Sequence, residues 1–107
     1  MDQGAGRDNP VRDNRQLQRF ELPVDDQVVF ANYRRQPGRL VITYVEAPPA
    51  LRGTGAAGRL MRGVLEEARA EQVKVLPLCG YARAWMLRHP EYRDLAVKSM
   101  MGSGGIA

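Results

Sequence analysis

Arg52-Gly53-Thr54-Gly55-Ala56-Ala57-Gly58 is a run of small residues with a strand-like segment before it and a helix-like segment after it. Leu40 to Glu46 is rich in the β-branched residues that pack well on a pleated sheet. A helix is predicted over 55–71, since apolar residues recur there at the three- and four-residue spacing of one buried face. Small residues at the start of a helix let backbone amides approach a phosphate closely. The sequence therefore predicts a phosphate-binding loop between a strand and a helix.

Two common phosphate-binding motifs fit this loop poorly. A nucleotide P-loop needs Lys and then Ser or Thr after its last glycine, whereas Arg59 and Leu60 follow Gly58. The dinucleotide-binding pattern Gly-x-Gly-x-x-Gly is matched literally by residues 53–58, but it needs an acidic residue about 20 positions later. Lys74 and Val75 occupy that region.

The loop instead resembles the acyl-CoA pyrophosphate loop of the GCN5-related N-acetyltransferases (GNAT superfamily). In that pattern Arg or Gln is followed by two residues, Gly, one residue, and then Gly or Ala, and Arg52, Gly55 and Ala57 fill these positions. Lys74-Val75-Leu76-Pro77-Leu78-Cys79-Gly80-Tyr81 and Arg88-His89-Pro90-Glu91-Tyr92 are similar to segments of the small YjdJ-type branch. The resemblance covers roughly residues 17 to 97.

The resemblance implies acetyl-CoA as co-substrate and an amine as acceptor. The cofactor-binding residues would be Arg52, Gly53, Thr54, Gly55, Ala56, Ala57 and Gly58. Their backbone amides would bind the pyrophosphate, and Arg52 would add positive charge. The pantetheine arm would lie along the end of the preceding strand, near Val45 to Ala47.

The order of the predicted elements indicates an α+β domain. Strands are expected near 16–22, 27–35 and 39–46, with a type II turn at Gln36-Pro37-Gly38-Arg39. A fourth strand over Val73 to Leu78 and a second helix over 80–89 follow the first helix. We therefore expect a compact GNAT-like fold, in which an antiparallel meander is followed by helix, strand and helix. The domain is expected over 15–98, between flexible segments at 1–14 and 99–107.

Size and composition restrict the class of protein. The 107 residues suffice for one domain, and 44% hydrophobic and 26% charged residues are ordinary for a soluble globular chain. No apolar run approaches the roughly 20 residues that span a membrane, and the first residues lack the features of a secretion signal. A single cysteine forms no internal disulfide, which fits a reducing compartment. We therefore expect a cytoplasmic protein.

Cys79 has two interpretations. A lone cysteine is most often a small buried hydrophobic residue. Its predicted place at the start of a helix is also where a helix dipole favours a thiolate. The resemblance implies that Cys79 lies near the sulfur of CoA, where it would accept the acetyl group and pass it to an amine.

Direct transfer needs a base, because an alkylamine is mostly protonated at neutral pH. Glu46, at the end of the third strand, is the best candidate, and its alternative is a solvated charge. Relatives often have His at the position of Tyr44, which removes one candidate base here. A regular strand would place Tyr44 and Glu46 on one face, and a bulge between them would not.

Two further residues have a chemical and a structural interpretation. Tyr81 would donate a proton to the leaving thiolate, or pack with its hydroxyl in solvent. His89, followed by Pro90, is expected to hydrogen-bond carbonyls at a helix end. One His and one Cys far apart in sequence do not suggest a metal site.

The leading hypothesis is therefore an acetyl-CoA-dependent N-acetyltransferase, with Cys79 and Glu46 as candidate catalytic residues. The alternative is a module that binds or senses acyl-CoA with little or no turnover. Nucleic-acid binding rests only on the net charge of +4, and the basic residues are scattered over every segment.

Overall fold

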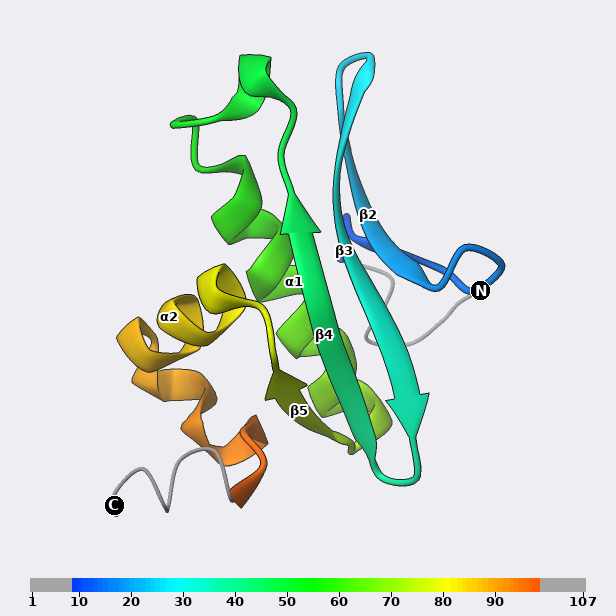
Figure 1. Cartoon of the computed structure of the whole chain (residues 1–107), viewed down its shortest axis with the longest axis vertical. Coiled ribbons are helices and arrows are strands. Elements are labelled where there is room, and N and C mark those ends of the chain that lie inside the picture. Colours follow the sequence, from blue (N-terminus) through cyan, green and yellow to red (C-terminus); the bar gives the residue numbers. More distant parts are fainter. Residues whose placement is uncertain (1–8, 99–107) are drawn as a thin grey trace.

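The computed structural model describes residues 9–98, which form one five-stranded sheet packed against helices (Figure 1). The strands lie in the order β1-β2-β3-β4-β5, and their bounds are Arg12–Asn14, Arg19–Val24, Gln27–Gln36, Arg39–Glu46 and Lys74–Pro77. The helices are η2 (Pro49–Leu51), α1 (Ala56–Glu71), α2 (Gly80–Arg88) and η3 (Pro90–Leu95). Neighbouring strands are antiparallel except for β4 and β5, which are parallel and are connected through α1. The predicted α+β order of meander, helix, strand and helix is confirmed.

Most element bounds agree closely with the patterns that predicted them, but the strand expected near 16–22 is β2 at Arg19–Val24, because residues 15–18 form a turn. The amphipathic spacing expected over 55–71 corresponds to α1, whose apolar stripe, including Leu60, Met61 and Val64, is fully buried. Gly38 has a φ of 72°, as the third residue of a type II turn requires. The apolar side chains of α1 pack on the sheet against buried residues of β2 and β3 such as Phe20 and Val29, and this contact forms the core.

The N-terminal part of the structure differs from the expectation of a flexible segment over 1–14. Residues 12–14 form β1, which pairs with β2, and Val11 is buried in the core with 8% of its surface exposed. The Asn9 Nδ2 donates a hydrogen bond to the Gly63 carbonyl of α1 at 2.8 Å. A side chain on Gly63 would overlap Val11, so this glycine makes room for the segment. Residues 1–8 and the expected tail at 99–107 lie outside the described residues.

A bulge in β4 sets the direction of the side chains near its end. Ile42 pairs with Tyr33 and Tyr44 pairs with the adjacent Asn32, so that Thr43 is an extra residue without its own partner in β3. Such an insertion exchanges the two faces of a strand. The position of this bulge, before Tyr44, is therefore decisive for the residues that follow.

The exchange of faces is visible in the burial pattern. Leu40 and Ile42, before the bulge, belong to the core, and after it Val45 packs against the same core. Tyr44 is 48% exposed and donates a hydrogen bond to Glu46. Tyr44 and Glu46 therefore share the face opposite Val45.

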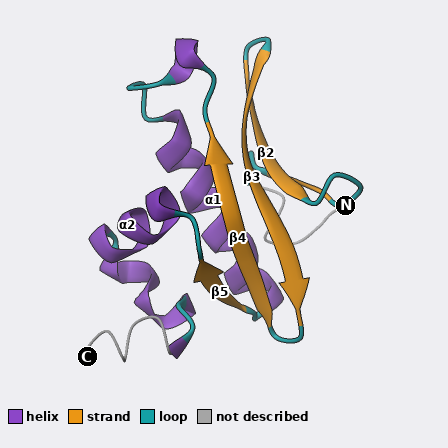
Figure 2. Cartoon of the chain, in the orientation of Figure 1, coloured by secondary structure: helices purple, strands orange, loops and turns teal. Residues whose placement is uncertain are grey.

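β4 and β5 pair over only part of β4. Their register runs from Arg39 opposite Lys74 to Ile42 opposite Pro77. The Ile42 carbonyl then accepts hydrogen bonds from the amides of Leu78 and Cys79, at 2.9 and 3.2 Å, and the chain turns into α2. Figure 2 shows the resulting divergence of β4 from the loop that leads into α2. The last residues of β4 thus keep an unpaired edge within the described sheet.

Candidate functional site

The start of α1 offers backbone amides without partners. Gly55 is the residue that precedes the helix, and no side chain caps it. The first helical hydrogen bond runs from the Arg59 amide to the Gly55 carbonyl at 3.1 Å, and the Ala56 amide reaches Thr54 Oγ1 at 3.3 Å. Within residues 9–98, the amides of Ala57 and Gly58 have no acceptor, and the first turn carries no acidic residue. Such an end attracts an anion.

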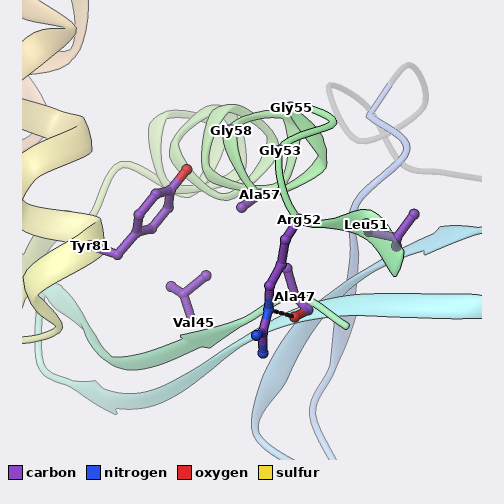
Figure 3. A pocket seen from close by; sticks show the side chains of 9 residues that line it. All are labelled: Val45, Ala47, Leu51, Arg52, Gly53, Gly55, Ala57, Gly58 and Tyr81. Carbon is purple, nitrogen blue, oxygen red and sulfur yellow. Dashed lines mark hydrogen bonds between the residues drawn. The ribbon is translucent and has the colours of Figure 1, made fainter. Parts of the chain in front are cut away.

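These amides face a cavity of about 460 Å³ between the end of β4, the loop and the start of α2 (Figure 3). Its lining residues are Val45, Ala47, Leu51, Arg52, Gly53, Gly55, Ala57, Gly58 and Tyr81. Five of the seven residues predicted to bind the cofactor belong to this lining. Thr54 and Ala56 do not: the Thr54 hydroxyl donates to the Leu51 carbonyl at 2.5 Å, and Ala56 is buried. The cavity is large enough for part of a cofactor-sized ligand.

Glycine is needed at the three positions of the loop for different physical reasons. Gly53 and Gly55 have φ values of 79° and 87°, which other residues adopt only with strain. A Cβ on Gly58 would instead lie 3.2 Å from Trp85 Nε1 of α2. The close contact of α1 with α2 therefore explains Gly58, and the shape of the loop explains the other two.

Arg52 lines the cavity, but its guanidinium group lies at the end of β4. Its Nε donates to the Ala47 carbonyl at 2.9 Å, and its Nη2 lies 3.3 Å from the Glu46 carboxylate. Figure 3 shows the side chain pointing away from the glycines and the start of α1. Arg52 therefore connects the loop to the strand.

Glu46 has partners at both of its carboxylate oxygens. Oε1 accepts the hydrogen bond from the Tyr44 hydroxyl, and Oε2 faces Arg52. The hydrogen bond to Glu46, together with the carboxylate charge, raises the pKa of Tyr44 above its ordinary value of 10.0. The bulge of β4 lies before both residues, so they share one face, as expected for a strand that is regular between them.

Cys79 is the residue immediately before α2, where the sequence predicted a helix start. It is partly buried and packs against the core. Burial raises the pKa of Tyr81. The Cys79 amide donates a hydrogen bond to the Ile42 carbonyl at 3.2 Å, which places Cys79 beside β4. Of the described residues at the start of α2, Tyr81 lines the cavity and Cys79 does not.

Other residues near the site have structural roles or were not anticipated. His89 Nδ1 lies 2.7 Å from the Trp85 carbonyl at the end of α2, as expected for a helix-end residue, and its ring stacks on Trp85 at 3.6 Å. Leu51, which the sequence did not single out, contributes an apolar wall from η2. Its only sequence signal was an apolar residue directly after Pro48-Pro49-Ala50.

Metal-binding clusters and membrane-spanning helices are both absent from the described residues. No group of three or more potential metal-binding side chains occurs within residues 9–98. None of the helices in the same part of the chain is both long and apolar enough to cross a membrane.

Comparison with protein families gives one match. The family described as GCN5-related N-acetyl-transferase matches residues 19–95. This range runs from the start of β2 to the end of η3 and includes the loop, Glu46 and Cys79. The comparison with curated proteins found no match.

Proposed function

The chain belongs to the GCN5-related N-acetyltransferase family, and we propose that it transfers an acetyl group from acetyl-CoA to an amine. The observation that carries this proposal is the start of α1, where unpaired amides line an open cavity. A diphosphate matches both the donors and the positive end of the helix dipole. We also propose the YjdJ-type branch and a cytoplasmic location, which rest on the sequence alone.

The donor would extend from the loop along β4. The amides around Gly55 to Gly58 would bind the diphosphate. The unpaired edge of β4 near Val45 would bind the pantetheine amides, because polar groups at a sheet edge need hydrogen-bond partners. The thioester would then lie where β4 diverges from the start of α2.

In a direct transfer, Glu46 takes the proton that an alkylammonium must lose before it can attack. The amine nitrogen bonds to the acetyl carbon, and the carbon–sulfur bond breaks. The leaving thiolate takes a proton from Tyr81, which lines the cavity. A second proton, released by the nitrogen as the amide forms, restores the Tyr81 hydroxyl.

A covalent route would use Cys79 instead. Its thiolate would attack the thioester and release CoA, and the amine would then attack the acetylated cysteine. The position of Cys79 directly before α2, two residues from Tyr81 of the cavity lining, supports this route. The direct and the covalent route both stay open.

One observation favours a second function, the binding or sensing of acyl-CoA without significant turnover. Both oxygens of Glu46 already have partners, so an amine must compete with Tyr44 and Arg52 for the candidate base. A sensing module would bind the same ligand at the same loop. Release of CoA in the presence of an amine distinguishes the two functions.

The test is a titration with CoA and acetyl-CoA, followed by thermal unfolding. Ligand at 100 times its Kd should stabilise the protein by about 2.7 kcal/mol. Amine acceptors are then screened for release of CoA thiol, and intact mass after exposure to acetyl-CoA shows whether Cys79 is acetylated. The absence of stabilisation by both ligands rejects the transferase and the sensing module together.

A further inference from the structure

The side chain of Arg52 contacts two groups that the proposed reaction needs. Its Nε holds the Ala47 carbonyl, at the strand end where pantetheine would bind. Its Nη2 faces Oε2 of Glu46, the candidate base, whose other oxygen is held by Tyr44. In this arrangement a substrate must compete with Arg52 for both the carbonyl and the carboxylate.

The contacts of Arg52 are easily exchanged. Its side chain is 62% exposed, and it faces Glu46 at 3.3 Å through one nitrogen. Ion pairs of this kind contribute little because solvent screens them. A phosphate accepts two parallel hydrogen bonds from a guanidinium group, which is a stronger arrangement.

An anion bound close to Arg52 would compete with Glu46 for its guanidinium group. The residue directly precedes Gly53 and lines the same cavity as the unpaired amides of Ala57 and Gly58. A diphosphate bound by these amides would therefore lie within reach of a long and exposed side chain.

We infer that Arg52 is a positioning residue that couples donor binding to the candidate base: it leaves Glu46 and Ala47 for the diphosphate when acetyl-CoA binds. This inference rests on the proposed function and deepens it. Donor binding frees Glu46 from its contact with Arg52. Without donor, Glu46 stays engaged by Arg52.

The coupling predicts an effect on affinity that needs no turnover. If Arg52 must leave Glu46 to reach CoA, removal of the Glu46 charge in Glu46→Gln should tighten CoA binding about two- to five-fold, the range of an exposed ion pair. Arg52→Gln should weaken CoA binding about ten-fold, because a charge-assisted contact to phosphate is lost. In the double variant the gain from Glu46→Gln should disappear, since no arginine is left to be released.

The experiment is isothermal titration of CoA into the wild type, both single variants and the double variant, at one salt concentration. Arg93→Gln, which changes an exposed arginine of η3, is the matched control and should leave the affinity unchanged. Circular dichroism verifies that every variant is folded.

The possible results separate this inference from the proposed function. A gain that persists in the double variant would mean that Glu46 repels CoA directly, and it would overturn the role of Arg52. No gain in Glu46→Gln would overturn it as well. If the wild type does not bind CoA at all, the proposed function fails together with this inference.

Discussion

Tyrosine, carboxylate and arginine side chains meet at several places within residues 9–98, and two of these clusters have different surroundings. The first, which we call the structural cluster, consists of Asp13, Tyr33, Arg35 and Glu71. The second, the site cluster, consists of Tyr44, Glu46 and Arg52. The chemistry is the same, so the difference must come from burial and from the number of contacts.

In the structural cluster, Arg35 is held on two sides. It contacts Glu71 of α1 at 2.7 Å and Asp13 of β1 at 2.8 Å, and only 27% of its side chain is exposed. Burial alone would lower the pKa of Arg35, because it disfavours the charged form. The hydrogen bonds to Glu71, Tyr33 and Asp13 outweigh burial and raise the pKa above its usual range. Arg52, with one longer contact to a carboxylate, is not fixed in this way. The first arrangement joins β1, β3 and α1, and the second is suited to exchange partners.

The largest expected difference concerns the two arginines. Arg35→Ala should lower the free energy of unfolding by about 2 kcal/mol, because it leaves two partly buried carboxylates with only the exposed Arg15 as a cationic partner. Arg52→Ala should change it by less than about 0.5 kcal/mol. Urea unfolding of both variants measures the contrast, and equal losses would show that burial does not distinguish the clusters.

The next largest expected effect on stability is that of a side chain at Gly55, in the loop that carries Arg52. Gly55→Ala should cost about 1–2 kcal/mol, because a side chain at a φ of 87° is strained. Gly80→Ala is the matched control: a Cβ there meets no atom within 4 Å, and its φ is ordinary. The same denaturation assay should show a loss only for Gly55→Ala, and a loss of similar size in both variants would contradict the strained loop.

The tyrosines of the two clusters, Tyr33 and Tyr44, should also differ in their contribution to stability. Tyr33 is buried and its hydroxyl donates to Asp13 at 2.5 Å, so Tyr33→Phe should cost about 1 kcal/mol. Tyr44→Phe should leave the melting temperature within experimental error, since its hydroxyl is exposed to solvent. Thermal unfolding followed by circular dichroism compares the two. A larger loss for Tyr44→Phe would place a structural role in the site cluster.

The smallest effect depends on pH. Burial, and next the hydrogen bond with Glu71, raise the pKa of Glu67 above 4.5. A raised pKa in the folded state stabilises below the unfolded value and loses that contribution as the pH rises through the folded value. Glu67→Gln mimics the protonated form and should gain less than about 1 kcal/mol at pH 7. Unfolding at pH 7 and pH 4 should show this gain disappearing in acid, and an equal gain at both values would contradict it.

The sequence predicted those parts of the fold that follow from local periodicity. The apolar spacing after Gly58 identified α1, and the β-branched run before the loop identified β4 with its observed bounds. The loop itself was found because its small residues are contiguous. These features depend on residues that are neighbours in the chain, so a single sequence is enough to predict them.

Features that depend on distant contacts escaped prediction. β1 is a short polar strand, anchored by Val11 against α1 and by the charge of Asp13. The bulge at Thr43 was also not predictable, because no residue type in β4 marks its position. The orientation of Arg52 is equally hidden, because it depends on where the end of β4 lies relative to the loop.

If the backbone at the start of α1 binds the diphosphate of CoA, its amides should respond when CoA is added. A titration of ¹⁵N-labelled protein with CoA, followed by amide resonances, measures this response. We expect the largest shifts at Gly53, Gly55, Ala57 and Gly58. Saturable shifts that leave these four amides unmoved, or no shifts at all, would contradict it.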